Sequence, residues 1–371
     1  MKRFGRIMIA AVLAVCMALA ATGCASGRIA ASVGDRTITV TELKNNYDNN
    51  QQYASIYGYD TTTEDGRKEF LEFILDQQLS TAVQAYQAEK AGVQLTAEET
   101  EEAKAAAADD YAKFIQQFVD YAKQAGSNEP EVYANKIMAE SLAKSGQSLS
   151  KMKKLFLQEQ EDSRRIVKYR DQLLAEVKLS EDDLKKMYDE ELATQQKELA
   201  EDPSYYFVME NFYNYGYTYM PLYVPEGFFY VRQILVADEE TANTVLEKIE
   251  AGEDFEALLE EYNTDPGMGT RPEGYVIGEG ANFVEEFLNA ALALENEGDV
   301  SPAVKSEHGY HIIKRMGEVP SGPVAYEDIK DEFDSMAVSN HESSYYNGLI
   351  QEWLKEDSVK KYPENYASIA D

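Results

Sequence analysis

Few side chains of this sequence could act as nucleophiles, proton carriers or metal ligands. The 371 residues include two cysteines, Cys16 and Cys24, and three histidines, His308, His311 and His341. The histidines and the scattered carboxylates show no spacing typical of a metal site, so we expect no bound metal. Both cysteines lie near the N-terminus, so any chemistry of the chain beyond them would proceed without a thiol nucleophile or a disulfide.

The N-terminus has the pattern of an export signal. Residues 1–6 carry three positive charges, an apolar run follows over residues 7–20, and small residues lead to Cys24. The run is short for a membrane span, and its flanks are those of a cleaved signal. Cys24 after a glycine resembles a bacterial lipobox, in which the cysteine is acylated and becomes the new N-terminus, although Ala21 stands where leucine is usual. We expect a lipoprotein signal peptide over residues 1–23, a lipid on Cys24 and a place at the outer face of the bacterial cell membrane. An ordinary signal peptide with an incidental cysteine and a retained single-pass anchor are the alternatives.

The composition is strongly acidic. There are 67 acidic against 35 basic residues and a formal net charge of −32, and cleavage of the basic signal would make the chain more acidic still. Such a chain repels nucleic acid and anionic membrane surfaces, so we expect neither as a partner. The charge is compatible with a tethered protein that stays soluble while it binds unfolded clients. The length suffices for about two domains.

The first half of the chain predicts a small hairpin followed by helices. Residues 29–39 read as two strands joined at Gly34, and apolar residues near helical spacing follow, ending at Gly92. Thr96 opens a capping box. Further helices are expected at 97–124, 129–144, 150–176 and 181–198.

This order of elements resembles the N-terminal chaperone domain of SurA-like and PrsA-type foldases. The resemblance covers about residues 29–195, and its best local match is residues 33–39 leading into Glu42 and Leu43. A plain all-helical domain is the alternative interpretation.

Aromatic residues are concentrated between Tyr205 and Tyr230, where twelve of 26 residues are Tyr or Phe. Prolines and glycines in the same stretch argue against a continuous helix. We expect a linker over residues 201–227, whose aromatic side chains pack on neighbouring domains. A client-binding loop is the alternative, because tyrosine suits wet, adaptable peptide surfaces.

The segment from residue 229 to residue 315 predicts the order β-α-α-loop-α-β-β. Its pieces closely resemble the parvulin, or rotamase, family. They are the opening strand Val231–Val236, a Gly-Glu-Asp-Phe sequence at residues 252–255, an Asp-Pro-Gly loop at residues 265–267, the sequence around Phe287 and the final strand at residues 309–313. The resemblance implies a peptidyl-prolyl cis/trans isomerase domain over residues 228–318, with a small antiparallel sheet surrounded by helices, that needs no cofactor.

The resemblance also implies which side chains form the site. Phe287 and Phe283 match the positions that hold the proline ring, and Asp265 matches the Cys or Asp that polarises the centre of the site. His311 matches the second histidine of a His–His core, and His308 falls where a small hydroxyl residue often stands. The expected catalytic residues are Asp265, His311, Gln233 and His308, and the expected substrate-binding residues are Phe283, Phe287, Tyr275 and Met268.

Gln233 is a departure from the family pattern. It stands where the family's first histidine usually follows the arginine of the opening strand. Glutamine has fixed donor and acceptor ends and does not titrate, so it cannot exchange protons with His311 as an imidazole would. Isomerase activity is therefore expected to be weaker than is usual in the family, and a non-catalytic holdase or peptide-binding lipoprotein with a vestigial rotamase domain is the alternative function.

The C-terminal region over residues 324–371 returns to helix, with apolar residues recurring at spacings of three or four. In PrsA-type foldases such a helix packs on the N-terminal helices. The expected fold is therefore α+β, with a helical domain over residues 24–200 that 324–371 complete and an isomerase domain inserted in it. The expected function is that of an extracytoplasmic folding factor acting on X-Pro segments of unfolded secreted proteins. A solute-binding lipoprotein would need repeated βαβ units, which the long helical runs oppose.

Overall fold

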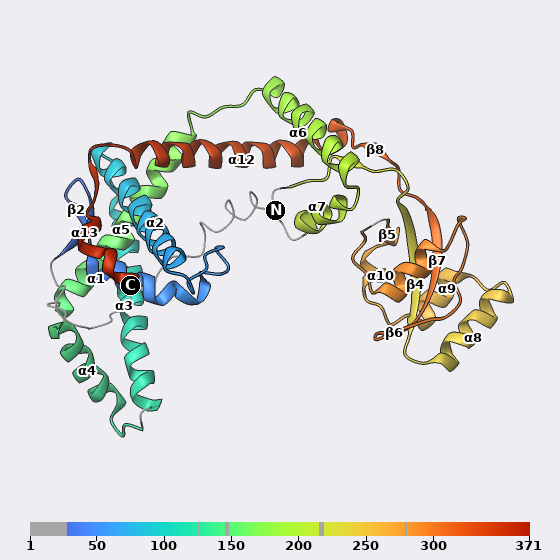
Figure 1. The fold of residues 1–371 in the computed structure, drawn as a ribbon, viewed down its shortest axis with the longest axis horizontal. Coiled ribbons are helices and arrows are strands. Elements are labelled where there is room, and N and C mark those ends of the chain that lie inside the picture. The colour runs from blue at the N-terminus through green and yellow to red at the C-terminus, as the bar shows by residue number, and fades with distance from the viewer. Residues whose placement is uncertain (1–27, 125, 145–147, 215–218, 279) are drawn as a thin grey trace. The chain divides into compact units, whose positions relative to one another are not determined.

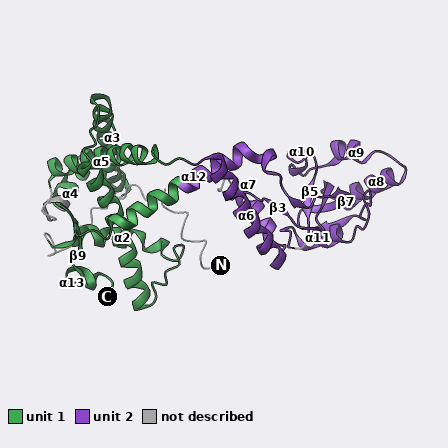
Figure 2. Cartoon of the chain, turned by 90° about the horizontal axis from the view of Figure 1, so that it is seen from above, with its two compact units in different colours: residues 1–178, 342–371 green, residues 179–341 purple. Residues whose placement is uncertain are grey.

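The computed structural model describes residues 28–124, 126–144, 148–214, 219–278 and 280–371 (Figure 1). The chain divides into two compact units, the first formed by Met1–Lys178 and Glu342–Asp371 and the second by Leu179–His341 (Figure 2). The predicted signal peptide and Cys24 lie outside the described residues. Within the described residues, no helix has the length and apolar character needed to cross a membrane.

Unit 1 consists of helices and one three-stranded antiparallel sheet. Its elements are β1 (Ile29–Val33), β2 (Arg36–Thr39), α1 (Val40–Asn50), a short 3-10 helix (Gln51–Tyr53), α2 (Glu64–Lys90), α3 (Ala97–Gln124), α4 (Pro130–Lys144), α5 (Leu149–Leu174), the last part of α12 (Tyr326–Trp353), β9 (Val359–Lys361), α13 (Pro363–Tyr366) and a second 3-10 helix (Ala367–Ile369). The strand order is β2-β1-β9, so the two ends of the chain pair in one sheet.

Local sequence explains how unit 1 begins. Gly34 forms the β1–β2 turn with φ +59°, and a Cβ there would lie 2.3 Å from the Tyr86 ring, so both the turn and the packing favour glycine. Thr39 then caps α1, because its hydroxyl accepts from the Glu42 backbone N–H while the Glu42 carboxylate accepts from the Thr39 N–H. The hairpin therefore leads directly into a helix, as the sequence predicts.

The core of unit 1 joins the beginning and the end of the chain. Buried side chains of α1 and α2 form one cluster with residues of the C-terminal part of α12 and of α13, among them Leu43, Tyr47, Phe70, Leu75, Leu79, Ile350 and Tyr366. Trp353 packs against this cluster, with its ring stacked on Tyr169 at a centroid distance of 6.0 Å. A separate cluster joins α3, α4 and α5 through residues such as Phe114, Met138 and Phe156.

Unit 2 begins with a helical part. Its elements are α6 (Glu181–Glu201), α7 (Tyr205–Asn214), β3 (Tyr223–Val224), β8 (Gly322–Pro323) and the first part of α12. The first boundary between the units follows Lys178, so α6 belongs to unit 2, whereas the sequence predicts it within the N-terminal domain. The second boundary follows His341, inside α12.

The helix α7 lies within the aromatic stretch for which the sequence predicts a linker. Its ten residues contain neither proline nor glycine, so the breakers of that stretch flank the helix and do not interrupt it. Tyr206 and Met209 of α7 are buried with Leu199, Phe228 and Val319. The stretch therefore packs onto its neighbours within unit 2, partly as a helix. Tyr215 and Tyr217 lie outside the described residues.

The rest of unit 2 is a four-stranded antiparallel sheet with helices on both faces. The strands are β4 (Phe229–Val236), β5 (Tyr275–Ile277), β6 (Val304–Ser306) and β7 (Gly309–Glu318), in the order β5-β4-β7-β6. The helices are α8 (Glu239–Glu250), α9 (Phe255–Tyr262), α10 (Gly267–Thr270) and α11 (Glu285–Leu292). The predicted α+β fold, with a small antiparallel sheet surrounded by helices, is confirmed.

Alternation along β4 and β7 gives this sheet two apolar faces. Ile234, Val236 and Ile312 pack with residues of α8 and α9. Val231 and Ile313 pack on the other face with Phe287 and Ala291 of α11. The polar side chains of the candidate site lie among these apolar residues.

Candidate active site

The pairing of β4 with β7 brings Gln233 and His311 together. Gln233 pairs with Ile313, and Leu235 pairs with His311. In an antiparallel ladder, residues two positions apart lie on the same face, so Gln233 and His311 are diagonal neighbours within reach of a long side chain. Their exposed fractions are 6% and 3%.

Gln233 bridges His311 and Asp265. Its Oε1 lies 2.6 Å from Nδ1 of His311, and its Nε2 donates to Oδ2 of Asp265 at 2.6 Å. The reverse orientation of the amide would place its oxygen against a carboxylate oxygen, where neither could donate. Since an amide oxygen only accepts, Nδ1 of His311 carries a proton and donates it.

The other ring nitrogen of His311 contacts Ser306, at the end of β6. The Ser306 Oγ lies 2.6 Å from Nε2 of His311. In the neutral imidazole Nε2 carries no proton, so the hydroxyl donates to it. A continuous chain of hydrogen bonds therefore runs from Asp265 through Gln233 and His311 to Ser306.

The Asp265 carboxylate, on the loop between α9 and α10, accepts from the first residue of α10 and from β5. The Gly267 backbone N–H donates to Oδ1 at 2.9 Å, and the Tyr275 hydroxyl donates to Oδ2 at 2.9 Å. Asn263 ties this loop to β4, because its Oδ1 accepts from the backbone N–H groups of Asp265 and Leu235, both at 3.0 Å. Burial, followed by the hydrogen bond to Asp265, raises the pKa of Tyr275, so the phenol stays protonated as a donor.

Apolar side chains stand beside this polar chain. Phe287 of α11 is 2% exposed, with its ring centroid 5.1 Å from that of Phe283 and 5.4 Å from that of His311. Tyr275 meets Phe283 edge-on at 5.1 Å. Met268 is buried and its sulfur accepts from the Gln233 backbone N–H at 3.4 Å. An apolar surface and a row of fixed hydrogen bonds thus share one small region.

Residues 235–317 match the model of the rotamase family, described as the PPIC-type PPIASE domain. This segment is a parvulin-type rotamase domain. The match runs from the end of β4 to β7 and begins two residues after Gln233.

Similarity to foldases accompanies the rotamase domain. The foldase protein PrsA of Caldanaerobacter subterraneus subsp. tengcongensis is 35% identical over 136 residues, which are 36% of this chain and 42% of that protein. The chain thus matches less than half the length of this curated relative. The predicted resemblance to the parvulin family and to PrsA foldases is confirmed over these matched residues.

Two solved structures are also similar. The solution structure of NmPin, the parvuline of Nitrosopumilus maritimus, is 35% identical and covers 25% of this chain and 99% of that one, with a TM-score of 0.23. The crystal structure of PrsA from Bacillus subtilis is 19% identical and covers 90% of this chain and 93% of that one, with a TM-score of 0.24.

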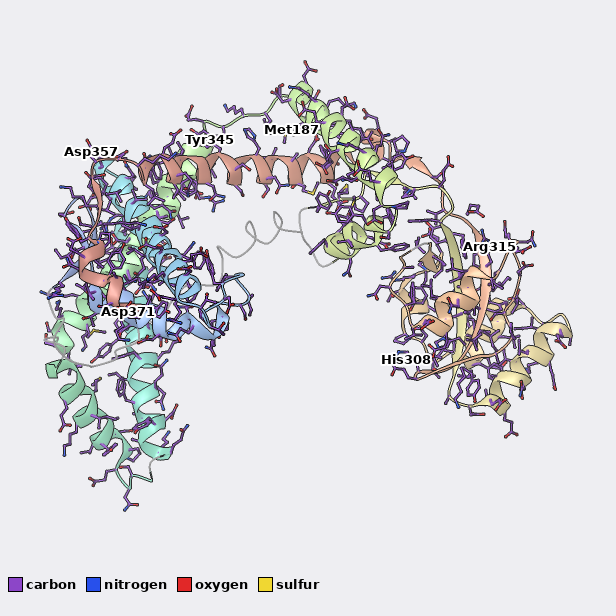
Figure 3. All side chains as sticks on the ribbon, in the orientation of Figure 1. Met187, His308, Arg315, Tyr345, Asp357 and Asp371 are labelled. Carbon is purple, nitrogen blue, oxygen red and sulfur yellow. The ribbon has the colours of Figure 1, made fainter. Side chains whose placement is uncertain are left out.

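The rotamase domain brings together seven of the eight side chains expected from the sequence: Gln233, Asp265, Met268, Tyr275, Phe283, Phe287 and His311. The exception is His308, at the β6–β7 turn (Figure 3), whose side chain is 58% exposed and lies near Glu307. Only its backbone N–H joins the site, donating to the Ser306 Oγ at 3.0 Å.

Ser306 and Asn263 are the polar residues of the rotamase domain that sequence reasoning missed. Ser306 pairs with Gly309 across a two-residue turn, which places its hydroxyl beside His311. A hydroxyl residue five positions before His311, on the other side of a short turn, is the signal that could have found it. Asn263 carries no such signal, because its contacts with Leu235 and Asp265 depend on how the loop docks on β4.

The rotamase domain holds His311 neutral. Burial lowers the pKa of His311, and His308 lowers it further, whereas Asp265 and Glu286 act in the opposite direction. The lowered pKa favours the neutral ring, in which Nδ1 donates to the amide oxygen of Gln233 and Nε2 can accept from the Ser306 hydroxyl.

Proposed function

We propose that the chain is an extracytoplasmic, membrane-anchored folding factor that catalyses cis/trans isomerisation of X-Pro bonds in secreted proteins and also binds these clients. The carrying observation is the hydrogen-bonded chain from Asp265 to Ser306 beside Phe283 and Phe287, within a rotamase domain. Similarity to a protein named as a foldase supports the wider role.

The chemistry requires no cofactor. Rotation about an X-Pro bond crosses a barrier of about 20 kcal/mol, because the planar amide is stabilised by resonance. The planar amide is more dipolar than the twisted one, so a site that replaces water by apolar walls favours the twisted form. Phe283, Phe287 and Met268 would surround the proline ring. The neutral His311 adds no charge, and three donors hold the Asp265 carboxylate.

Proline exchange spectroscopy by NMR tests this function. The chain from residue 25, which contains every described residue, is added to a panel of X-Pro peptides, and exchange cross-peaks report the isomerisation rate. We expect catalysis that Asp265→Ala and His311→Ala abolish. His341→Ala serves as the matched control, because this histidine lies on α12 outside the rotamase domain. Exchange at the uncatalysed rate in the unmodified chain would contradict the proposal.

A non-catalytic holdase is the second candidate, and Gln233 favours it. The amide links Asp265 to His311 but cannot pass a proton between them. A Gln233→His variant separates the two functions. Activity that appears only in this variant would favour the holdase, because the unmodified site would then lack an imidazole that catalysis requires. Equal activity in both chains would show that catalysis needs hydrogen bonding at this position and no proton exchange.

We also propose that a lipid on Cys24 holds the chain at the outer face of the cell membrane. The support is the basic, apolar and small-residue pattern of residues 1–24. Metabolic labelling with an alkyne fatty acid in a bacterial host should modify the unaltered chain. Cys24→Ser should lose both the label and membrane association. Retention of the label would place the lipid elsewhere.

A further inference from the structure

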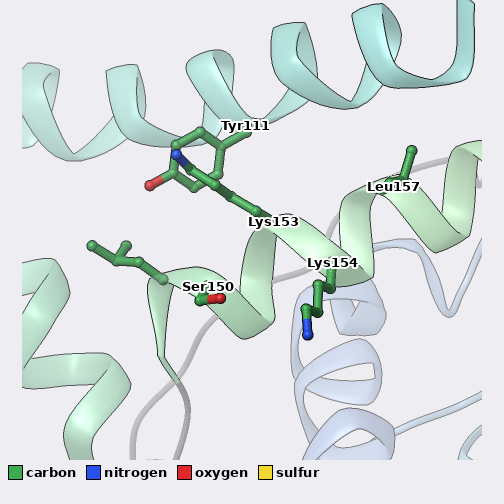
Figure 4. Close-up of a pocket in the computed structure, with 6 residues that line it drawn as sticks. Tyr111, Ser150, Lys153, Lys154 and Leu157 are labelled. Atoms are coloured by element: carbon green, nitrogen blue, oxygen red, sulfur yellow. The ribbon is translucent and has the colours of Figure 1, made fainter. Parts of the chain in front are cut away.

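A pocket lies between α3 and α5 in unit 1, away from the rotamase site in the sequence. Its volume is about 510 Å³, and its lining consists of Tyr111, Leu149, Ser150, Lys153, Lys154 and Leu157 (Figure 4). Five of these residues come from the first three turns of α5, and Tyr111 comes from α3. Their spacing along α5 forms one stripe on the helix surface.

The two lysines of this pocket, on α5, differ from the lysines of α3 in their pairing. Among the described residues, Lys153 and Lys154 form no ion pair, whereas Lys104, Lys113 and Lys123 of α3 each pair with an acidic residue of the same helix. Lys153 lies along the Tyr111 ring, with its ammonium 4.8 Å from the ring centroid (Figure 4). Lys154 points away from this ring in the same view.

The two carboxylates next to Tyr111 in sequence contact side chains other than these lysines. Asp109 pairs with Lys113, and Asp110 accepts from Gln160 Nε2 at 2.7 Å. The first turn of α5 contains no acidic residue, so the positive end of the helix dipole adds to the lysines. The chain has a net charge of −32, so the positive charge of Lys153 and Lys154 is opposite in sign to that of the chain as a whole.

The rest of the lining is apolar. Leu149 is 37% exposed, and Leu157 and Tyr111 are partly buried against the cluster that joins α3, α4 and α5. These three side chains offer a surface to an aliphatic or aromatic group. A phosphate polymer would leave that surface uncovered, and the lining contains no arginine, the side chain that best matches phosphate geometry.

We infer that this pocket binds client segments in which carboxylate side chains stand next to apolar ones. The inference rests on the proposed client-binding function and gives it a place and a chemistry. The lysines attract the carboxylates, and the leucines and Tyr111 cover the apolar side chains. The net negative charge of the chain repels such segments, so a local pair of lysines beside apolar side chains favours their binding at this pocket.

Fluorescence anisotropy of labelled peptides tests the inference. The chain from residue 25 is titrated into three peptides of equal length that alternate leucine with glutamate, lysine or serine, at about 0.15 M salt, where long-range repulsion is screened. We expect the Leu-Glu peptide to bind more tightly than the Leu-Ser peptide. The double variant K153E/K154E should weaken Leu-Glu binding by about tenfold or more, and Leu149→Ser should weaken it by a smaller factor.

The control for the change of net charge is K185E/K186E, an adjacent lysine pair on α6 in unit 2 that pairs with Asp189 and Glu190, and it should leave Leu-Glu binding unchanged. Circular dichroism verifies that each variant is folded. Unchanged binding in K153E/K154E, or no preference for the Leu-Glu peptide, would overturn the inference. Inorganic polyphosphate that binds in place of the peptide, with no effect of Leu149→Ser, would make this a polyanion site and also overturn it. Proline exchange, measured in parallel, reports the rotamase domain independently.

Discussion

The Gln233 side chain lies between Asp265 and His311, with its amide nitrogen 2.6 Å from one and its amide oxygen 2.6 Å from the other. This amide assigns the proton of His311 to Nδ1 and leaves Nε2 to accept from Ser306. The site is therefore a directed row of hydrogen bonds with one tautomer. An imidazole at position 233 could exchange tautomers with His311, whereas the Gln233 amide cannot.

The lowered pKa of His311 predicts a pH dependence of stability. Between this lowered pKa and the ordinary value of 6.5, the unfolded chain binds more protons than the folded one. The free energy of unfolding should therefore fall as the pH decreases through this window, and the contribution of His311 should be fully present above pH 6.5. Urea unfolding at a series of pH values checks this. His311→Gln should remove that part of the slope, and an unchanged slope would contradict the assignment.

Ser306 and His308 can be separated by substitution. Ser306→Ala leaves the buried Nε2 of His311 without a donor, which should cost about 1–3 kcal/mol in the free energy of unfolding of the rotamase domain and reduce proline exchange. His308→Ala should change either quantity little, because its side chain is exposed. Ser306→Thr keeps the hydroxyl and should retain most of the activity. A larger effect of His308→Ala than of Ser306→Ala would reverse these assignments.

At the scale of elements, the connections to the four-stranded sheet are fixed by side chains of α6. Gln195 is fully buried, its Nε2 donates to the Met220 carbonyl at 2.9 Å, and its Oε1 accepts from the Leu222 N–H at 2.7 Å. Tyr188 donates to the Val324 carbonyl, and the Val324 N–H donates to the Leu222 carbonyl. One glutamine therefore pairs with an extended segment as a neighbouring strand would.

Gln195→Ala should destabilise unit 2 by about 1–3 kcal/mol, because two buried backbone groups lose their partners. The neighbouring Gln196 is exposed on the same helix, so Gln196→Ala is a matched control that should change stability by less than about 0.5 kcal/mol. Hydrogen exchange of the Leu222 amide, which donates to Gln195, should accelerate in the first variant. Equal effects of the two substitutions would show that Gln195 acts only through helix propensity.

At the scale of the whole molecule, the two compact units have separate hydrophobic cores. Trp353, the single tryptophan, belongs to unit 1, where it contacts Tyr169 and Tyr346. The rotamase sheet has its own clusters on its two faces. We therefore expect the units to unfold in separate steps, with tryptophan fluorescence reporting unit 1 alone.

Two core substitutions test this separation. Phe287→Ala should destabilise unit 2 by about 3–5 kcal/mol, because a buried ring is lost from the face that α11 covers, without moving the midpoint of tryptophan fluorescence. Leu79→Ala, in the unit 1 core, should move that midpoint to lower urea. Hydrogen exchange of the β4 and β7 amides follows unit 2. A fluorescence midpoint that moves with Phe287→Ala would show that the units unfold as one.

The sequence by itself predicted the order β-α-α-loop-α-β-β of the rotamase domain, without the short α10 and β5, and its resemblance to the parvulin family implied seven of the side chains that meet there. Alternation along β4 and β7 and the Asp-Pro-Gly loop are local patterns, so they can be recognised without the fold. The helix start at Thr96 could also be predicted, because its capping box depends on residues three positions apart.

Only the tertiary structure decided the rest. Ser306, and not His308, contacts His311 because strand register and turn geometry select which of two nearby residues faces the ring. The helix α7 is stabilised by burial of Tyr206 and Met209, which a count of nearby prolines and glycines does not reveal. The tautomer of His311 follows from an amide 78 residues away. Each depends on contacts between distant parts of the chain, and local periodicity carries no information about them.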